Sequence, residues 1–336
     1  MRVVFYVDYP LSWAKGGHAV QIMETKKCLE ELGVEILWLH HEDLIEQEAD
    51  VLHYWSLPPN DMHWKLARAR GLKIVISTLH QQSVLRPKWS WGLRRLMTPF
   101  AEMMLGHGLF GLLGHEVYSN CDAAIAVTPY EREYMIKALG AKRSETFYVP
   151  NGIDSMLFDG EMPQIQFDGL TYVGYISERK NSLEVAKAAK RASVPIRFIG
   201  GPAFKNDPYF MNFKKEVDNR AVFWEDEVTD KRQLVSYIKG SKGLVLASKN
   251  EAVGLVVLDA LAVGKPVLLS DLPNLRQYFG PNVTYCSQPT GKKFIIELED
   301  FFKNPPQRAM DKSFLLTWMA VAKLIKGIYD RVLASA

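Results

Sequence analysis

The sequence predicts an α/β fold in which two doubly wound parallel sheets lie in tandem, each with helices on both faces. Short β-branched runs alternate with stretches whose apolar residues recur at helical spacing, a pattern typical of parallel sheets. The alternation restarts after Pro150-Asn151-Gly152, and 336 residues suit two domains at roughly 100–200 residues each. Hydrophobic residues make up 48% and charged residues 24% of the chain, a globular balance that excludes a disordered, collagen-like or disulfide-stapled protein.

The first half begins with a strand at Val3–Val7, followed by a helix at 19–32 that Gly33 ends. The next predicted strands and helices follow the same alternation: strands 35–39, 51–54, 73–77 and 123–127, and helices 62–69 and 129–139. In the second half, we expect strands at 170–173, 196–199, 221–224, 243–246 and 266–269, and helices at 183–191, 231–239 and 255–263. Residues 150–165, which carry Pro150, Gly152, Gly160 and Pro163, are expected to form a hinge, and 314–333 a last amphipathic helix.

The net charge and the cysteine content indicate which cellular compartment and which binding partners the protein is expected to have. A net charge of +3 does not call for a nucleic-acid partner, because dedicated binders show a denser basic face. Three widely spaced cysteines without a C-x-x-C pair favour a reducing compartment over disulfides or a zinc site. The apolar run at the N-terminus is too short for a signal peptide, and no run of 18 apolar residues exists. We therefore expect a cytoplasmic protein.

Residues 85–116 form an unusual basic segment that contains Trp89 and Trp91. Pro99 is expected to break this segment into two helices. Two interpretations are open. The segment is either a core-facing helix with a solvated basic face, or a peripheral contact of residues 86–103 with an anionic membrane at its cytoplasmic face.

Glycines and cations stand at two of the predicted strand-to-helix corners. Gly16-Gly17 precedes the first helix, where free backbone N–H groups favour an anion, although the spacing is not that of a dinucleotide fingerprint. Arg179 and Lys180 stand at a second corner, where a phosphate is expected to bind. The alternative interpretations are a plain turn at the first corner and a solvated basic turn at the second.

The stretch 248–266 carries two acids with unusual surroundings. Glu251 precedes Gly254 and an apolar helix, and Asp259 follows eight residues after Glu251 within that apolar run. A carboxylate in an apolar run is costly unless it is paired or hydrogen-bonded, and a sugar diol is a natural partner. The helix N-terminus near Gly254 favours a diphosphate. The alternative is structural: Glu251 caps the helix, and Asp259 faces solvent or a buried arginine.

This stretch resembles the E-x7-E signature of retaining nucleotide-sugar glycosyltransferases with the GT-B fold, which form glycosyltransferase family 4. The resemblance continues in order along nearly the whole chain, at Gly16-Gly17, Ser77–His80, Cys121–Thr128, Val149–Asp154 and Val173-Gly174 with Lys180. It implies a Rossmann-like acceptor-side domain at 1–155, a Rossmann-like donor domain at 156–312, and a C-terminal helix at 313–336 that packs back on the first domain.

The resemblance also implies a mechanism and residue roles. A hexosyl group would pass from a nucleotide diphosphate sugar to a saccharide, lipid-linked or small-molecule acceptor, as in polysaccharide or glycolipid biosynthesis. Asp259 would hold the ribose, while Arg179, Lys180 and the N–H groups near Gly17 and Gly254 would stabilise the leaving diphosphate. Glu251 would orient the donor sugar. These cations and the helix dipole would replace a metal, so the resemblance implies metal independence and no cofactor.

Three further residues of the first domain are predicted to contribute to the site. His80 is expected to come from that domain and touch the sugar or the acceptor, with a satisfied strand-end histidine as the alternative. His53 and Trp55, which follow a strand, are weaker candidates for the acceptor side.

Two departures from the family pattern leave other classes open. The second acid of the signature is Asp259 rather than Glu, and Tyr175 replaces an expected arginine. A non-catalytic or weakly active sugar- or nucleotide-binding homologue is therefore the alternative to a glycosyltransferase. An epimerase or phosphorylase on the same twin-domain fold is a third interpretation.

Overall fold

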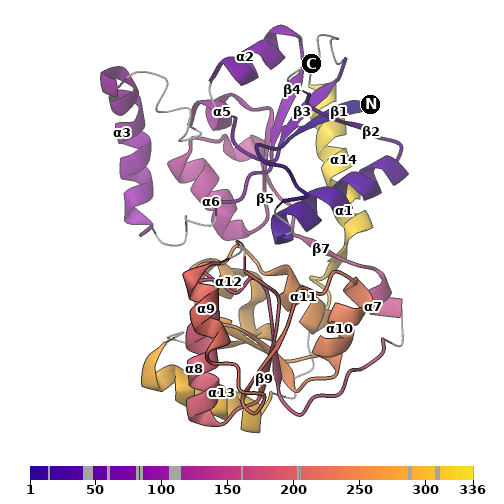
Figure 1. Cartoon of the computed structure of the whole chain (residues 1–336). Coiled ribbons are helices and arrows are strands. Elements are labelled where there is room, and N and C mark those ends of the chain that lie inside the picture. The colour runs from indigo at the N-terminus through magenta and orange to yellow at the C-terminus, as the bar shows by residue number, and fades with distance from the viewer. Residues whose placement is uncertain are drawn as a thin grey trace. The chain divides into compact units, whose positions relative to one another are not determined.

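The computed structural model describes residues 1–13, 16–40, 48–58, 61–80, 83, 86–105, 115–159, 162–202, 204, 206–286, 290–306 and 311–335, with side chains other than those of 61, 99–105, 115 and 159. The chain divides into two compact units (Figure 1). Unit 1 comprises Met1–Gly152 and Leu316–Ala336, and unit 2 comprises Ile153–Leu315.

Unit 1 contains a parallel sheet of six strands in the order β2-β1-β3-β4-β5-β6. The strands are β1 (Arg2–Tyr6), β2 (Glu35–Trp38), β3 (Val51–Tyr54), β4 (Lys73–Ile76), β5 (Ala123–Ala126) and β6 (Thr146–Tyr148). Strands β3 and β5 are buried along their whole length, as expected for a parallel sheet with both faces covered. The predicted parallel architecture is confirmed.

The helices of unit 1 flank this sheet. They are α1 (Gly17–Glu31), α2 (Asp61–Ala69), α3 (Trp89–Leu105), α5 (His115–Asn120), α6 (Pro129–Ala138) and α14 (Trp318–Ala334), with a 3-10 turn at Arg143–Glu145. Local chemistry fixes the start of α6: Pro129 occupies its first turn, and the Thr128 hydroxyl accepts a 3.0 Å hydrogen bond from the Glu131 N–H.

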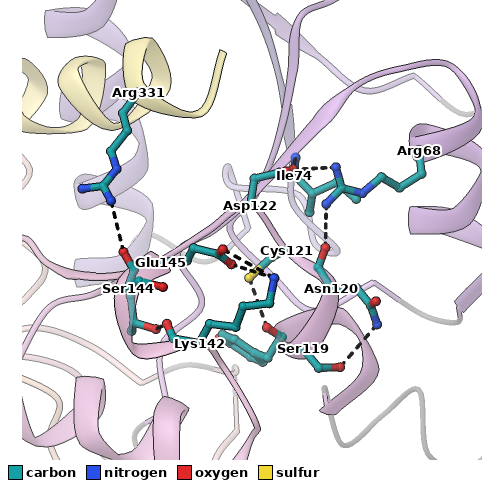
Figure 2. Close-up of polar contacts among 12 residues, drawn as sticks. Arg68, Ile74, Ser119, Asn120, Cys121, Asp122, Lys142, Ser144, Glu145 and Arg331 are labelled. Atoms are coloured by element: carbon teal, nitrogen blue, oxygen red, sulfur yellow. Dashed lines mark hydrogen bonds and ion pairs between the residues drawn. The ribbon is translucent and has the colours of Figure 1, made fainter. Parts of the chain in front are cut away.

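Asp122 joins β4 to β5 at the amino ends of these strands, and Figure 2 shows its contacts with Arg68 and Ile74. Its Oδ2 atom accepts a 2.6 Å hydrogen bond from the Ile74 N–H and lies 2.8 Å from the Arg68 guanidinium. Arg68 also donates to the Asn120 carbonyl at 2.6 Å. The acid of the Cys121–Thr128 segment therefore has a structural function: it holds the register of two neighbouring strands.

The last helix packs back on the first domain, as predicted: α14 lies along α1 (Figure 1). Within the core of unit 1, the Tyr329 hydroxyl lies 2.5 Å from His53 Nδ1, and His53 Nε2 lies 2.7 Å from the Ser77 hydroxyl. Two residues further along α14, Arg331 donates to the Ser144 carbonyl at 3.5 Å (Figure 2). Unit 1 is therefore completed by residues that follow unit 2 in the chain.

Unit 2 repeats the architecture with the order β10-β9-β8-β11-β12-β13, again all parallel. Its strands are β8 (Leu170–Val173), β9 (Ile196–Ile199), β10 (Val222–Glu225), β11 (Gly243–Leu246), β12 (Val267–Ser270) and β13 (Thr284–Cys286). Its helices are α7 (Met156–Asp159), α8 (Ser182–Ala192), α9 (Pro208–Lys214), α10 (Lys231–Lys239), α11 (Leu255–Ala262), α12 (Pro273–Phe279) and α13 (Gly291–Lys303), with a 3-10 turn at Gly280–Asn282. Helix α8 packs against α9 and α13, whereas α10 packs against α11.

Two short strands, β7 (Gly152–Ile153) and β14 (Leu316–Thr317), pair where the chain leaves and re-enters unit 1. Gly152 has to be small at this point, because a Cβ atom there would lie 2.7 Å from the backbone of Trp318. Trp318 begins α14 and is 7% exposed. The return of the chain to unit 1 is thus closely packed.

Helix α3 corrects the prediction that Pro99 breaks the basic segment into two helices. The helix runs without interruption from Trp89 to Leu105. A proline inside a helix removes one backbone hydrogen bond and tends to kink or break the helix. The turns before Pro99 are held by tertiary packing, because Trp91 packs edge-on against Tyr130 and Tyr134. Among the helices of the described residues, none combines the length and apolar character that crossing a bilayer requires.

The buried His53 predicts a loss of stability in acid. Burial lowers the pKa of His53 from 6.5 to about 3, so the imidazole is neutral in the folded protein at pH 5 while that of the unfolded chain takes up a proton. Stability from this group is therefore complete above pH 6.5 and is lost as the pH falls toward 3. We expect the stability advantage of the wild type over His53→Gln to shrink by about 2 kcal/mol between pH 7.5 and pH 5.

Urea denaturation at the two pH values measures this difference. The same substitution at the exposed His40 is the control, because it removes an imidazole from the surface rather than from the core. An advantage over His53→Gln that stays constant with pH would show that His53 is protonated inside the fold.

Candidate active site

The strand order of unit 2 reverses between β8 and β11, which are neighbours in the sheet. The loops that follow these two strands therefore begin on either side of one point at the carboxyl edge. In doubly wound sheets, ligands bind in the crevice that forms at such a point. The loop after β8 carries Arg179 and Lys180, and the loop after β11 carries Glu251 and Gly254.

Lys180 and Glu251 form an ion pair that joins these two loops. The Glu251 side chain is 7% exposed and that of Lys180 is 12% exposed, so both charges are largely withdrawn from water. Arg179 brings a second cation to within 3.9 Å of the same carboxylate oxygen and is 41% exposed. The structure thus brings together three of the predicted residues, with one cation buried against the acid and the other open to solvent.

Hydrogen bonds to backbone carbonyls hold the two loops against each other. Arg179 donates to the Asn250 carbonyl at 3.1 Å and accepts from the Lys249 N–H at 2.9 Å through its own carbonyl. From α12, the Asn274 amide donates to the carbonyl of Glu251 at 2.8 Å. The backbone on which Glu251 stands is therefore held by contacts on both sides of the loop.

Glycines keep this edge of the sheet free of side chains. Gly254 begins α11 with φ +80°, a conformation that other residues rarely adopt, and α11 has no side-chain cap. Gly200, at the end of β9, approaches Gly174 so closely that a Cβ atom on it would lie 2.3 Å from the Gly174 carbonyl oxygen. The N-terminus of α11 thus presents backbone N–H groups and the positive end of the helix dipole beside the loops.

Asp259 has a cation partner that the sequence did not identify. Its carboxylate, 5% exposed, lies 2.5 Å from Lys231 Nζ at the start of α10, and Lys231 is 37% exposed. The apolar surroundings of Asp259 indicate that it needs a partner, but Lys231 lies 28 residues earlier in the chain, on another helix. Because that contact depends on tertiary structure alone, no local spacing in the sequence marks it.

His80 lies in unit 1, in the loop after β4. Its Nε2 atom lies 2.6 Å from the Tyr118 hydroxyl and 3.1 Å from the Thr78 hydroxyl, and its backbone N–H donates to the Glu131 carboxylate at 2.6 Å. Burial, assisted by the nearby Arg94 charge, lowers the pKa of His80 to about 3, so the imidazole is neutral near pH 7. The contacts of Nε2 thus match the alternative interpretation, in which His80 is a histidine at a strand end whose hydrogen bonds are made within the protein.

Glu131 links the loop after β4 to the end of β5. Its two carboxylate oxygens accept from the backbone N–H groups of His80 at 2.6 Å and of Val127 at 2.9 Å. Burial raises the pKa of Glu131 to about 7, although both hydrogen bonds favour the ionised form. Sequence reasoning missed this contact between the two segments, because Glu131 lies inside α6 and has no motif around it.

His53 and Trp55 are core residues of unit 1. His53 is 0% exposed and Trp55 is 1% exposed, and their rings stack with centroids 4.4 Å apart. Both ring nitrogens of His53 have hydroxyl partners. This burial counts against a direct contact with an acceptor.

Gly16 and Gly17 stand at the start of α1, as expected. Gly16 caps the helix without a side chain, and Gly17 is its first residue. The next residue, His18, lies 2.9 Å from the Tyr9 hydroxyl through Nδ1. These groups belong to unit 1, whereas Arg179, Lys180, Glu251, Gly254 and Asp259 belong to unit 2.

The acidic side chains of the candidate site form ion pairs with lysines. Across the residues that the structure describes, no group of three or more His, Cys, Asp or Glu side chains is placed to hold a metal ion. Glu251 and Asp259 each pair with one lysine instead.

Two family descriptions match the chain, and together they span most of it. Residues 34–156 match the family described as Glycosyltransferase Family 4, and residues 168–312 match the family described as Glycosyl transferases group 1. No curated protein sequence matches the chain significantly.

Solved structures share the fold across nearly their full length. The chain is similar to sucrose-phosphate synthase from Thermosynechococcus elongatus, with a TM-score of 0.73, 14% identity, and coverage of 100% of this chain and 99% of that one. It is also similar to HepE from Anabaena in complex with UDP and glucose, with a TM-score of 0.65, 13% identity, and coverage of 99% and 98%. A glycosyltransferase from Rickettsia africae matches with a TM-score of 0.72 at 11% identity over 100% and 99% of the two chains. At these identities the likeness establishes the GT-B fold.

The Lys180–Glu251 pair is expected to matter for stability. Lys180→Met leaves the Glu251 carboxylate buried beside only the half-exposed Arg179, and we expect it to lower the free energy of unfolding by about 3 kcal/mol. Adding Glu251→Gln removes the uncompensated charge and should recover most of that loss.

Chemical denaturation of both single variants and the double variant measures the coupling. Lys190→Met is the matched control, because Lys190 pairs with Glu216 at 3.1 Å on the surface of the same unit and should contribute less than about 1 kcal/mol. A Lys180→Met variant as stable as Lys190→Met would show that the pair contributes no more than a surface contact.

Proposed function

Since this chain belongs to the group 1 glycosyltransferases of family 4, which use nucleotide-sugar donors, we propose that it transfers a hexosyl group from a nucleotide diphosphate sugar with retention of configuration. The acceptor is proposed to be a saccharide, a lipid-linked sugar or a small molecule. One observation supports the proposal most: Arg179, Lys180 and Glu251 converge at the point where the strand order of unit 2 reverses.

The diphosphate of the donor is proposed to bind beside Arg179 and Lys180. As the bond to the sugar breaks, negative charge grows on the leaving diphosphate, and fixed cations stabilise that charge more strongly than water does. The uncapped N-terminus of α11 at Gly254 adds its N–H groups to the same stabilisation. These groups supply the positive charge that a metal ion supplies in other enzymes, so we propose that transfer is independent of metal.

Glu251 is proposed to orient the donor sugar. A buried carboxylate that holds one lysine still has lone pairs free for sugar hydroxyls, because two oxygens offer about four acceptor sites. Its contact with Lys180 then places the sugar next to the cation that binds the diphosphate. This arrangement fixes the reacting bond between the two groups, which lowers the entropic part of the barrier.

Asp259 is proposed to hold the donor ribose, with Lys231 as its counter-ion. The lysine offsets the cost of burying the carboxylate and is itself partly exposed, so it remains able to move when hydroxyl groups approach. From unit 1, the neutral His80 and the glycines Gly16 and Gly17 are proposed to meet the sugar, the acceptor or the diphosphate. Nucleic acid is not a proposed partner, and the proposed location is cytoplasmic.

A non-catalytic binding homologue is the second candidate. Tyr175 and Asp259, which depart from the family pattern, are the observations that favour it. A panel of nucleotide sugars, scored first by thermal shift and then by turnover, distinguishes the two: binding without transfer or donor hydrolysis would support the second candidate.

Glu251→Gln is expected to abolish transfer with little effect on nucleotide affinity. The amide keeps an oxygen for Lys180 but loses the charge and half of the acceptor sites for sugar hydroxyls. We expect turnover to fall by about 100-fold or more, as for a misplaced substrate. Initial rates with the donor found in the panel measure this, and Glu216→Gln on the surface is the control. Turnover within twofold of the wild type would remove Glu251 from the mechanism.

Lys180→Met is expected to weaken the binding of nucleoside diphosphates more than the binding of nucleosides. A phosphate loses a charged partner, whereas the base and the ribose do not. A hydrogen bond to a charged group contributes roughly 1.5–3 kcal/mol, so affinity for UDP, GDP or ADP, whichever binds, should fall at least tenfold. Calorimetry against the matching nucleoside provides the comparison, and Lys190→Met controls for net charge. Equal weakening of both ligands would argue against a phosphate contact.

A further inference from the structure

The buried carboxylate of Glu131 connects two segments at the carboxyl edge of the unit 1 sheet. Strands β4 and β5 are neighbours in this sheet. The loop after β4 carries His80, and Val127 directly follows β5. One carboxylate oxygen accepts from the His80 backbone N–H at 2.6 Å, and the other accepts from the Val127 N–H at 2.9 Å. A single side chain thus holds the backbone of both segments.

The charge of Glu131 has no cation beside it. The residue is 5% exposed, and among the residues that the structure describes no lysine or arginine forms an ion pair with it. Arg94 of α3 donates to the Tyr134 hydroxyl at 2.6 Å instead. A buried carboxylate without a counter-ion depends on hydrogen-bond donors. The negative charge of Glu131 therefore depends on the two backbone N–H groups, and the hold on those groups depends on the charge.

The position of His80 is determined through both its ring and its backbone. The Nε2 atom of the ring lies 2.6 Å from the Tyr118 hydroxyl and 3.1 Å from the Thr78 hydroxyl. The backbone N–H is held by Glu131 on α6. Loss of the second contact leaves the loop after β4 without its link to the end of β5, so the imidazole is no longer fixed relative to that strand.

We propose that the Glu131 carboxylate positions His80 for the transfer reaction by clamping the loop after β4 to the end of β5, and that uptake of a proton by Glu131 loosens this clamp. A protonated carboxyl carries a hydrogen on one oxygen, which then presents a donor to one of the two N–H groups. Glu131 acts through His80, so it is a positioning residue and not a catalytic one. The inference rests on the proposed function, in which His80 meets the sugar or the acceptor.

The surroundings of Glu131 set the pH at which the clamp loosens. Burial raises the pKa of Glu131 to about 7, and the two hydrogen bonds oppose this effect. The charged or titratable side chains around the contact are His80, Tyr118 on α5, Tyr134 on α6, Arg94 on α3 and Tyr148 of β6, whereas β5 carries none. Burial lowers the pKa of His80 to about 3, raises that of Tyr118 well above 10 and raises that of Tyr148 to about 12. The clamp is therefore closed above pH 7 and loosens as the pH falls below 7.

The amide proton of His80 reports on the clamp without any transfer reaction. In protein labelled with ¹⁵N-histidine, the His80 amide resonance is identified by its loss in His80→Gln. We expect this resonance to shift with pH in the wild type, with a midpoint near 7, and to stay constant in Glu131→Gln, whose side chain does not ionise. The wild-type titration needs no substitution at Glu131, so it decides the clamp even if Glu131→Gln fails to fold.

Steady-state rates test whether the clamp serves the reaction. With the donor found in the panel, the wild-type kcat should fall as the pH drops through about 7, because protonated Glu131 releases the loop. In Glu131→Gln, kcat at pH 8 should be about tenfold or more below that of the wild type, and the acid limb of the profile should be absent. Affinity for the nucleotide, which is proposed to bind unit 2, should stay within about twofold of the wild type.

Glu133→Gln is the matched control on the same helix. Glu133 is 30% exposed and pairs with Lys137 at 2.8 Å, so this substitution also removes one carboxylate from α6 but leaves the contact with His80 intact. The variant should keep the wild-type kcat, the wild-type pH profile and the pH titration of the His80 amide.

Two results would overturn the proposal. One is a wild-type His80 amide resonance that does not shift between pH 5.5 and pH 9. The other is a folded Glu131→Gln whose kcat and pH profile match those of the wild type. Absence of transfer by the wild type with every nucleotide sugar would contradict the proposed function and with it the role of His80, whereas a pH titration of the His80 amide in that same protein would still establish the clamp.

Discussion

The ion pair between Lys180 and Glu251 joins two loops whose paired residues lie 71 positions apart in the sequence, and the candidate site of unit 2 depends on it. A carboxylate withdrawn from water needs a cation or several donors close by. Glu251 satisfies that need through Lys180, with Arg179 behind it. The buried carboxylate of Asp259, in the helix that follows Glu251, also needs a cation, and it pairs with Lys231. Two buried acids thus fix the positions of two lysines, which are the cations at the proposed donor site of unit 2.

The fold and the centre of the site could be predicted because both follow from a repeating pattern. Alternating strands and helices imply a parallel sheet, and a parallel sheet places the carboxyl ends of its strands on one edge. Arg179, Lys180 and Glu251 each follow a strand, so their meeting follows from topology once neighbouring strands are assigned. The glycines fit the same reasoning, since Gly254 stands where the loop turns into α11 with a positive φ.

The contacts that escaped prediction depend on tertiary packing. His53 was placed on the acceptor side because it lies near the carboxyl end of the strand predicted at 51–54. The strand has these bounds, but the His53 side chain is fully buried, and Tyr329 covers it from the last helix. The pairing of Asp259 with Lys231 and the placement of Glu131 beneath His80 have no local spacing. Pro99 was expected to break the basic segment into two helices because local propensity was weighed without the packing of Trp91 against Tyr130 and Tyr134. In each case a distant or neighbouring side chain outweighs the local rule.

Because of the path of the chain, the two units complete their folding at different times during synthesis. Unit 2 is one continuous segment and holds all of its sheet between Ile153 and Leu315, so it can fold as soon as that segment leaves the ribosome. Unit 1 has to wait for α14, because the bond between His53 and Tyr329 spans 276 positions. At 5–20 residues per second, that wait is roughly 10–40 s beyond the end of the first sheet. During that time, the incomplete unit 1 exposes the face of α1 and the end of β3 that α14 later covers. Unit 1 is therefore synthesised first but finishes folding after unit 2.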